Sequence, residues 1–266
     1  MMRLDLYLYK NGYTRSRQKA QELISAGAIT IDGKTVTKSS FLVDETVGHT
    51  VLVKETCPYV GRGGLKLEAA LRTFSISPKD TVAADIGAST GGFTDCLLKH
   101  GARRVYAIDA GYDQLAPALK ADGRVISIEH FNARALTQDT LGEKCDLAVM
   151  DVSFISQTLI LPGITAILKQ NGKLISLIKP QFEAGKSAIG KNGIVRNEAY
   201  RFLSVRRVLH AAEGLGLFCT GLIRSPIKGG DGNTEYLAAF EMRGVPITVS
   251  PYTDLQIQRI TSRTDR

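Results

Sequence analysis

The stretch from residue 82 to residue 93, VAADIGASTGGF, places the strongest limit on how this chain can fold. An apolar run typical of a buried strand ends in Asp85, a glycine-rich turn follows, and a helical pattern begins at Phe93. A doubly wound α/β sheet builds a nucleotide-sized crevice from a strand, a tight turn and a helix in this order. The dinucleotide motif G-x-G-x-x-G would need a glycine where Ser89 stands. The stretch therefore predicts a nucleotide-type site, but not one for a nicotinamide or flavin dinucleotide. An ordinary glycine-rich turn is the alternative.

Length, charge and cysteine content narrow the class of protein. The chain of 266 residues suffices for one large domain and a small one, and no apolar run approaches the roughly 20 residues of a membrane span. The first residues lack the apolar segment of a signal peptide, and the four cysteines form no C-x-x-C pair. We therefore expect a cytoplasmic protein with small buried thiols, no disulfide, no metal and no membrane partner. The net charge of +8 suggests an anionic partner without identifying it.

Residues 1–54 carry the pattern of a small α+β domain. The apolar positions of residues 3–26 have helical spacing, and Thr14 is a suitable N-cap for the second helix in this range. Two short strands flank the turn Asp32-Gly33, which is a strong hairpin signal, and a third strand is expected at 50–54.

Basic side chains are concentrated in this first domain. Between residues 3 and 19, five basic residues stand against one acid, Asp5. The segment 13–34 resembles the αL RNA-binding module, which occurs in a small-subunit ribosomal protein and in pseudouridine synthases. The resemblance implies binding of folded RNA mainly through its phosphates, whereas a solvated helix face is the alternative. The residues expected at the RNA are Arg3, Lys10, Arg15, Arg17, Lys19 and Lys34.

A second domain is expected over 62–245, after a linker at 55–61 in which Pro58 breaks regular structure. From residue 82 onward strand and helix signals alternate, as in a parallel α/β sheet. The strand after the glycine loop ends in Asp109, 22 residues beyond Gly87. An acid at this point of a doubly wound nucleotide site accepts hydrogen bonds from ribose hydroxyls. The glycine loop itself resembles motif I of S-adenosylmethionine-dependent methyltransferases.

The remaining elements follow from the same alternation. We expect strands over 125–128, 146–151, 172–182 and 234–240, helices over 159–169 and 198–215, and loops over 183–197 and 226–233. The tail 246–266 has weak periodicity and stays unassigned. Six basic residues stand against one acid between 185 and 207, which makes this region a second candidate RNA surface that includes Lys186 and Lys191.

Four charged residues, Lys66, Asp151, Lys179 and Glu235, call for a common explanation. Asp151 and Lys179 follow predicted neighbouring strands at their carboxyl ends, where open α/β sheets bind ligands. Glu235 begins a later strand after a glycine-rich loop. A structural salt bridge is the alternative for any single pair. A set of four beside a glycine-rich cofactor loop favours catalysis.

The motifs together resemble one family. They are the αL module, R-G-G-x-K, D-I-G-A-S-T-G-G-F-T-D, M-D-V-S-F-I-S, I-K-P-Q-F and G-N-x-E. This combination is similar to the TlyA group of ribosomal RNA 2′-O-methyltransferases, historically called haemolysin A, whose catalytic domain is of the FtsJ type. The resemblance implies a Rossmann-like methyltransferase domain, S-adenosyl-L-methionine as cofactor, and methyl transfer to a ribose 2′-hydroxyl of ribosomal RNA, with cytidine as the precedent.

The resemblance also implies roles for particular residues. Lys179 would stabilise or accept the hydroxyl proton, Lys66 would position the ribose, and the carboxylates Asp151 and Glu235 would orient the two lysines. Arg62 would join the RNA-binding residues. The residues expected at the cofactor are Asp85, Gly87, Ala88, Ser89, Thr90, Gly91, Gly92, Asp109 and Asn132.

Three rival functions come from other classes. A pore-forming toxin, as the historical name suggests, is disfavoured because the sequence has no export signal, no span and no basic amphipathic helix with a broad aromatic face. A small-molecule methyltransferase would not need the basic N-terminal domain, and a non-catalytic RNA-binding or ribosome-assembly protein would not need the four charged residues. The sequence does not define the oligomeric state, and a monomer or a weak dimer is compatible with it.

Overall fold

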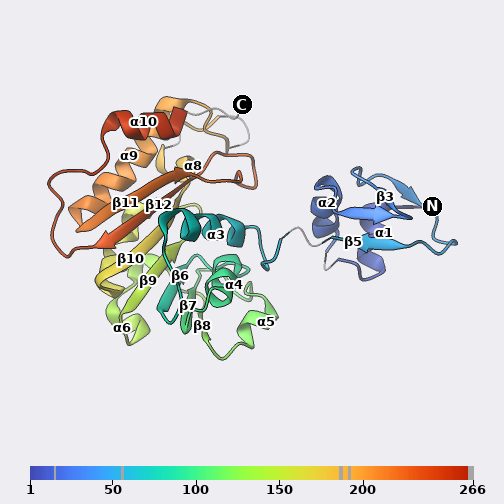
Figure 1. Cartoon of the computed structure of the whole chain (residues 1–266), viewed down its shortest axis with the longest axis horizontal. Helices are drawn as coiled ribbons and strands as arrows, with labels where there is room; N and C mark the ends of the chain where they lie inside the picture. The colour runs from blue at the N-terminus through green and yellow to red at the C-terminus, as the bar shows by residue number, and fades with distance from the viewer. Residues whose placement is uncertain (15, 55–56, 186–187, 191–192, 263–266) are drawn as a thin grey trace. The chain divides into compact units, whose positions relative to one another are not determined.

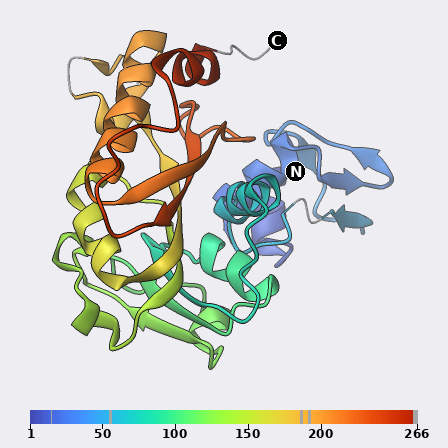
Figure 2. The same cartoon turned by 60° about the vertical axis from the view of Figure 1, so that its left-hand side comes forward.

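The protein folds into two compact units, Met1–Pro58 and Tyr59–Arg266 (Figures 1 and 2). The structure, a computed structural model, describes residues 1–14, 16–54, 57–185, 188–190 and 193–262. Three expected RNA-binding residues, Arg15, Lys186 and Lys191, lie outside these described residues.

The first unit is a small α+β fold with its own core. Its elements are β1 (Met2–Arg3), α1 (Leu4–Lys10), α2 (Arg17–Ser25), β2 (Ile29–Ile31), β3 (Lys34–Thr35), β4 (Leu42–Val43) and β5 (Val51–Val53). Strand β2 pairs antiparallel with β3 and with β5, so the expected hairpin and third strand are present. Both turn residues, Asp32 and Gly33, have positive φ, as a tight two-residue hairpin turn requires. The sequence did not predict the short pair of β1 and β4.

The N-cap of α2 is Ser16, not Thr14 as the sequence suggested. Ser16 is extended, and its hydroxyl accepts a hydrogen bond from the Lys19 backbone N–H at 3.1 Å. Thr14 is buried and donates its own hydroxyl to the Ser16 carbonyl. Both residue types cap helices well, so the sequence alone could not choose between them.

The second unit is built on a seven-stranded sheet in the order β11-β12-β10-β9-β6-β7-β8. Its strands are β6 (Val82–Ile86), β7 (Arg104–Ile108), β8 (Val125–Ile128), β9 (Cys145–Met150), β10 (Leu168–Ile178), β11 (Leu217–Arg224) and β12 (Tyr236–Met242). Strands β6 to β10 are parallel where they pair, and β12 is antiparallel to both β10 and β11. All five residues of β6 are buried, as expected for a strand covered on both faces. The expected mostly parallel, doubly wound sheet is confirmed.

Helices cover both faces of this sheet (Figures 1 and 2). They are α3 (Gly63–Phe74), α4 (Gly92–Lys99), α5 (Pro117–Lys120), α6 (Gln138–Leu141), α7 (Leu161–Ile167), α8 (Pro180–Glu183), α9 (Glu198–Gly214) and α10 (Asp254–Ser262), with 3₁₀ turns at Ala133–Ala135 and Gln157–Leu159. Helices α3 and α4 pack together, and α9 packs on β11 with α10 against it. Helix α10 lies in the tail that the sequence left unassigned.

Three sequence expectations need correction around β10 and β11. The helix expected over 159–169 ends at Ile167, because Leu168 already pairs with Cys145 of β9. The strand expected to reach residue 182 ends at Ile178, and Pro180 starts α8 at the position where a missing N–H costs least. Strand β11 was not predicted, although it forms the edge of the sheet beside β12.

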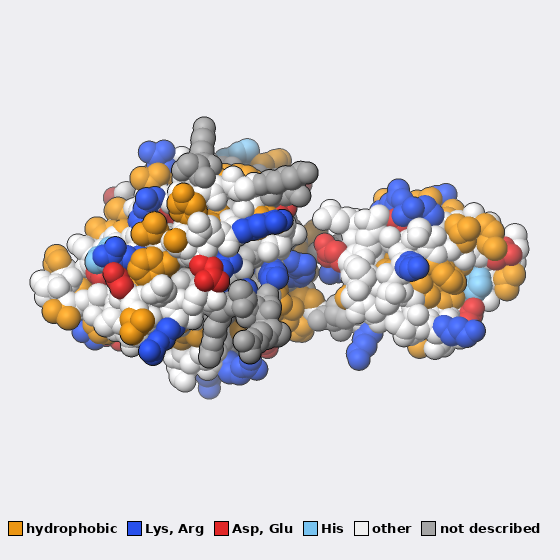
Figure 3. Space-filling model, turned by 90° about the horizontal axis from the view of Figure 1, so that it is seen from above, with side chains coloured by type: hydrophobic (Ala, Val, Ile, Leu, Met, Phe, Trp, Pro, Cys, Tyr) orange, Lys and Arg blue, Asp and Glu red, His pale blue; other side chains and the backbone are white. Residues whose placement is uncertain are grey.

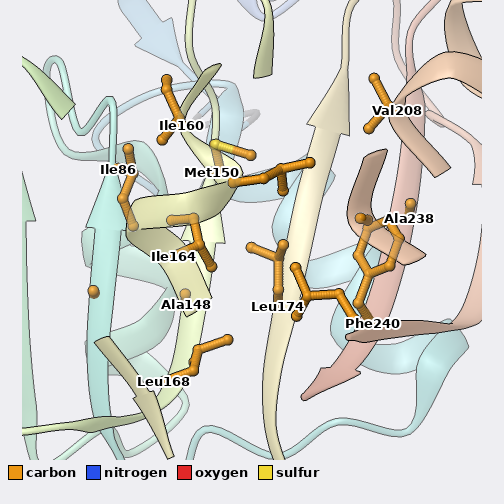
Figure 4. Packing of buried hydrophobic residues seen from close by; sticks show 14 of the residues in the cluster. Ile86, Ala148, Met150, Ile160, Ile164, Leu168, Leu174, Val208, Ala238 and Phe240 are labelled. Atoms are coloured by element: carbon orange, nitrogen blue, oxygen red, sulfur yellow. The ribbon is translucent and has the colours of Figure 1, made fainter. Parts of the chain in front are cut away.

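The main core lies between the sheet and its helices (Figure 4). Met150, Ile164, Leu174 and Phe240 are fully buried there. Burial of each such side chain contributes about 1.5–3 kcal/mol to stability. Three of the four cysteines are buried as free thiols, as expected, and Cys57 is half-buried.

The boundary between the units falls after Pro58. Tyr59 is buried, and the Val60 N–H donates to the Asp95 carboxylate at 2.8 Å. The last residues of the expected linker therefore belong to the second unit, where they lead directly into α3.

Candidate active site

The candidate site lies where four neighbouring strands end. Strands β6, β7, β9 and β10 are parallel, so the residues that follow them meet at one edge of the sheet. These residues are Gly87, Asp109, Asp151 and Lys179. The sequence predicted this convergence from the position of each residue after its strand.

The glycine loop after β6 turns on a backbone conformation that few other residues adopt. Gly87 has φ +85°, and a Cβ atom at this position would lie 2.5 Å from the backbone oxygen of Asp151. The N–H groups of Gly87 and Ala88 both donate to the Ile108 carbonyl. Glycine is therefore required here, because the loop passes directly over the end of β9.

Asp109 is fixed at the end of β7 by two backbone amides. Its Oδ2 accepts from the Ser89 N–H at 2.8 Å, and its Oδ1 accepts from the Gly111 N–H at 2.7 Å. A carboxylate has about four lone-pair sites, so both oxygens can still accept hydrogen bonds from a ligand. The side chain is thus oriented as a ribose-binding acid would need to be.

Two cavities adjoin at this edge of the sheet. The larger cavity of the two has a volume of about 590 Å³ and opens beside the glycine loop. Its lining includes the polar side chains of Asp109, Gln114 and Asn132 together with aromatic and aliphatic side chains. The full lining is Gly87, Ser89, Ile108, Asp109, Ala110, Gln114, Phe131, Asn132, Ala133, Asp151, Val152, Ser153, Phe154, Ile155 and Ile160. A lining that combines apolar side chains with a carboxylate suits the base and ribose of a nucleoside.

A smaller cavity of about 220 Å³ adjoins it and is more polar. The two cavities share Gly87, Ser89, Asp151 and Ser153. The smaller one is also lined by Gly61, Arg62, Gly63, Ala88, Thr90, Gly92, Phe93 and Lys179. An elongated ligand in the larger cavity can therefore extend one end toward Lys179.

Lys179 and Asp151 form an ion pair at this junction. The Lys179 Nζ lies 2.6 Å from Asp151 Oδ1, but the angles of this contact are not those of a regular hydrogen bond. The same Nζ donates a hydrogen bond to the Ser153 hydroxyl at 2.9 Å. It also lies 5.9 Å from the centre of the Phe182 ring. The lysine is thus held by three contacts, and the residue lines the smaller cavity.

Lys66 and Glu235 form a second ion pair, with Nζ 2.5 Å from Oε2. Both residues are buried, and neither lines either cavity. Ile178 pairs with Tyr236 in the antiparallel ladder of β10 and β12, so Lys179 and Glu235 are the next residues beyond its end. The structure therefore divides the four expected catalytic residues into two pairs that meet at the same edge of the sheet.

The expected cofactor residues fall into three groups. Gly87, Ser89, Asp109 and Asn132 line the larger cavity, and Ala88, Thr90 and Gly92 line the smaller one. Asp85 and Gly91 line neither. Gly91 has φ +95°, and a Cβ atom there would lie 2.2 Å from Leu119 Cδ1, so this glycine serves the packing of the loop.

Asp85 lies fully buried beneath the glycine loop. Its Oδ2 accepts the Thr94 hydroxyl at 2.6 Å, and Oδ1 has no hydrogen-bond partner among the described residues. Burial raises the pKa of Asp85 to about 7, and the nearby carboxylates Asp151 and Asp109 add to the rise, whereas the bonds from Thr94 oppose it. Asp85 therefore lines neither cavity, and its Oδ2 binds the first turn of α4 at Thr94.

Two of the expected RNA-binding arginines hold a buried acid. Arg3 and Arg17 contact the carboxylate of Asp5 at 3.1 and 2.9 Å, and Gln21 donates to it at 2.6 Å. Burial alone would raise the pKa of Asp5, but the hydrogen bonds from Arg3, Gln21 and Arg17 lower it below its usual range. Both arginine side chains are still about half exposed, which leaves them accessible to a phosphate.

The other expected RNA-binding residues differ in their surroundings. Lys10 and Lys34 are exposed, whereas Lys19 pairs with Glu22 at 3.7 Å. Arg62 lines the smaller cavity and donates to the Lys228 carbonyl at 3.3 Å. Lysine and arginine side chains are spread over the visible face of each unit, not gathered in one block (Figure 3).

Three of the six basic residues between 185 and 207 have structural partners. Arg201 pairs with Glu198 and Arg206 with Asp254, and Arg207 donates to the Glu183 carbonyl at 2.6 Å. Arg196 is exposed, and the other two lie outside the described residues. The described part of this region thus offers fewer free cations than its composition suggested.

Several site residues were not singled out from the sequence. Ser153 contacts Lys179, and Phe131 and Gln114 line the larger cavity. Phe154 is 92% exposed at the rim of this cavity and has φ +63°, an unusual conformation for an aromatic residue. A large exposed aromatic gives no periodic signal, and only its place in the motif M-D-V-S-F-I-S, three residues after Asp151, could have indicated it.

The glycine loop, the acid after β7 and the nucleoside-sized cavity are the features of a Rossmann-like methyltransferase. The sequence profile of the FtsJ-like methyltransferase family matches residues 59–242, and that of the S4 domain matches residues 2–50. The expected resemblance is confirmed by individual relatives as well.

Three relatives cover nearly the whole chain. It is 44% identical over 240 residues to Hemolysin A of Brachyspira hyodysenteriae, which spans 90% of this chain and 99% of that one. It is 42% identical over 234 residues to the 16S/23S rRNA (cytidine-2′-O)-methyltransferase TlyA of Mycobacterium tuberculosis, and the match covers 88% of this chain and 87% of that protein. A solved structure from Streptococcus thermophilus that carries the name hemolysin has a TM-score of 0.78 and 40% identity. The match covers 98% of this chain and 94% of that one. The chain belongs to the FtsJ-like methyltransferase family, in the TlyA group with an N-terminal S4 domain.

Proposed function

We propose that this protein transfers a methyl group from S-adenosyl-L-methionine to the 2′-hydroxyl of a cytidine ribose in ribosomal RNA. The observation that carries the proposal is the Lys179–Asp151 ion pair, which lines a small polar cavity directly beside the nucleoside-sized one. The family, the S4 domain and the name of the mycobacterial relative support the choice of RNA as substrate.

The residues present fit the cofactor. Asp109 has free lone pairs for the ribose hydroxyls, and the apolar wall with Phe131 and Ile160 suits the adenine. The backbone at Gly87 leaves no room for a side chain between the glycine loop and β9. S-adenosyl-L-methionine supplies a methyl group on a sulfonium, which is already a good leaving group. The protein must therefore align the acceptor and manage its proton.

Lys179 is placed for that second task. Lys179 lines the smaller cavity, and Asp151 and Ser153 hold its amine in one position. An amine fixed in this way can stabilise the developing negative charge on the 2′-oxygen or take part in removing the proton. Alignment of two bound reactants by fixed groups contributes several kcal/mol in addition.

Lys66, on α3, and Glu235, the residue before β12, support this arrangement. Glu235 holds Lys66 at the end of the β10–β12 ladder, next to Lys179. We propose that this second pair keeps the edge of the sheet closed beside Lys179 and thereby helps to position the ribose.

The partner and place of action follow from the substrate. We propose that the S4 unit binds rRNA on ribosomal subunits in the cytoplasm. No helix among the described residues is long and apolar enough to span a membrane, and these residues contain no His, Cys, Asp or Glu cluster suited to a metal.

Methyl transfer to purified ribosomal subunits tests the proposal. Radiolabelled S-adenosyl-L-methionine should label the rRNA of at least one subunit, and mapping should place the methyl group on the 2′-oxygen of a cytidine. Asp109→Ala should weaken cofactor binding by about 1 kcal/mol or more, the scale of hydrogen bonds to a charged group. Label on free small molecules with none on RNA would overturn the substrate, and no label on either would overturn the enzyme class.

A further inference from the structure

Glu183 is a buried carboxylate that no step of the proposed reaction uses. It is 2% exposed and is the last residue of α8, the short helix whose N-cap is Lys179. Its Oε2 accepts the Ser156 hydroxyl at 2.6 Å, and its Oε1 accepts the Gln157 backbone N–H at 2.8 Å. Glu183 thus joins the helix after β10 to the segment after β9.

The segment after β9, residues 151–156, forms walls of both cavities. Asp151 and Ser153 line both, and Phe154 and Ile155 line the larger one. This segment is anchored at its far end by Gln157, whose side chain donates to the Leu177 carbonyl at 2.5 Å and accepts the Ser176 hydroxyl at 2.5 Å.

Three successive contacts connect residues 151–156 with α8. Ser153 accepts a hydrogen bond from Lys179, the rings of Phe154 and Phe182 lie 5.1 Å apart, and Ser156 donates to Glu183. Arg207 of α9 donates to the Glu183 carbonyl at 2.6 Å and fixes the end of α8. Glu183 is therefore the polar anchor of a contact line that has Lys179 at its other end.

A carboxylate is an expensive group to bury for packing alone. Burial raises the pKa of Glu183, and the hydrogen bonds from Ser156 and Gln157 and the charge of Arg207 oppose that rise. An apolar side chain would fill the same space without this cost. What the carboxylate adds is its pair of hydrogen bonds to Ser156 and Gln157, at the end of the 151–156 segment.

We propose that Glu183 is a positioning residue. It keeps the 151–156 segment, which forms a wall of the larger cavity, in a fixed position relative to the Lys179 amine. Only the expected effect on turnover rests on the proposed methyl transfer. Without Glu183, Ser156 and Gln157 lose their two hydrogen bonds to α8, so both the 151–156 segment and the Lys179 amine gain freedom. Cofactor affinity and turnover should then fall together, whereas RNA affinity should not change.

The test compares Glu183→Ala with Glu183→Gln in the full-length protein. Gln keeps an acceptor for the Gln157 N–H and can exchange donor and acceptor roles with the Ser156 hydroxyl, so it should restore function. Glu213→Ala is the matched control, because Glu213 is also a buried glutamate, lies on α9 and bonds to Ser250 away from both cavities. Ser156→Ala removes one of the two bonds and serves as the milder variant if Glu183→Ala does not fold.

Three measurements separate positioning from plain stabilisation. Calorimetry should show S-adenosyl-L-methionine binding weakened about tenfold in Glu183→Ala, and kcat should fall up to about 10²-fold, the scale of a misplacement of about 1 Å. Hydrogen exchange of the ligand-free protein should become faster in residues 151–160. The KM for RNA should stay close to the wild-type value in Glu183→Ala. The Glu183→Gln variant and the Glu213→Ala control should resemble wild type in all of these measurements.

The inference would be overturned if Glu183→Ala kept the wild-type cofactor affinity, kcat and hydrogen exchange and differed from wild type only in a lower Tm, as the control does. If the wild-type protein does not methylate RNA, the proposed function fails. Hydrogen exchange and cofactor affinity still decide the role of Glu183 in that case.

Discussion

The two ion pairs at the carboxyl edge of the sheet combine the same chemical groups in different surroundings. The Lys179 and Asp151 side chains are 12% and 21% exposed and line a cavity, whereas those of Lys66 and Glu235 are 9% and 3% exposed and line neither cavity. Besides its ion pair with Asp151, Lys179 donates a hydrogen bond to Ser153 that fixes its direction. Residue type and position at the sheet edge alone therefore do not distinguish an ion pair that lines a cavity from one that is buried and lines neither cavity.

The difference has an energetic side. A pair that is buried on all sides loses much of its Coulombic gain to desolvation, and removal of one partner leaves an uncompensated charge. A pair at a cavity keeps some contact with solvent and with ligands, so its loss should affect chemistry more than folding. The following variants test this division, from the largest expected effect to the smallest.

Lys179→Ala should reduce methyl transfer most, by roughly 10²- to 10⁴-fold, the usual range for a group that acts on a proton in the transition state. Cofactor and RNA binding should remain, because Lys179 belongs to neither the Asp109 side of the larger cavity nor the S4 unit. Lys179→Arg keeps the charge, but its guanidinium is effectively never deprotonated and has another shape. We expect the arginine variant to be nearly as inactive as the alanine variant, measured on intact ribosomal subunits.

Lys169→Ala is the matched control for this prediction. Lys169 lies on the same strand, β10, and pairs at 2.6 Å with Asp146 on the neighbouring strand, but at the opposite end. Its loss should leave activity unchanged. Substantial activity in Lys179→Arg would assign Lys179 a purely electrostatic role, and full activity in both Lys179 variants would remove it from the catalytic group.

The second ion pair should respond through stability. Lys66→Met leaves Glu235 buried without its partner and should destabilise the protein by about 3–5 kcal/mol, whereas the double variant Lys66→Met/Glu235→Met should recover much of this loss. Denaturant unfolding of the single and double variants measures the difference. We expect methyl transfer to stay low in the double variant, in accordance with the proposed role of Lys66 at the ribose. Recovery of both stability and activity would instead make this pair a structural closure of the sheet.

The sequence predicted the parts of this site that follow from strand position. Asp109, Asp151 and Lys179 each come directly after an apolar strand, and parallel strands bring their ends together. The sequence could not predict Ser153 and Glu183 as partners, because these contacts depend on how the segments after β9 and β10 fold back on each other. The same reasoning grouped Asp85 with the cofactor residues, although its side chain lies under the loop.

Asp85 extends the comparison to a buried carboxylate without a lysine. Its pKa is raised to about 7 by burial, so the folded protein retains this proton more tightly than the unfolded chain between about pH 4 and pH 7. Stability is therefore lost as pH rises through this window. Asp85→Asn removes the titration, and the variant should gain stability relative to wild type as pH rises from 5 to 8. Thermal unfolding at both values checks this. An equal offset at the two pH values would contradict the raised pKa of Asp85.

The same distinction between paired and unpaired cations should appear in the first unit, with the smallest effects. Lys10 and Lys34 are exposed and form no ion pair with a described residue, whereas Arg17 holds the buried Asp5. Lys10→Ala and Lys34→Ala should each weaken RNA binding modestly and reduce the slope of log K against log salt by about 1, without a change in stability. Arg17→Ala should lower the stability of this unit as well, because Asp5 loses one of its charged partners. Binding to ribosomal subunits across a salt series, with unfolding measured in parallel, separates the two cases. An unchanged salt slope in both lysine variants would mean that these side chains are only a solvated surface, and that the RNA contact depends on other residues of the unit.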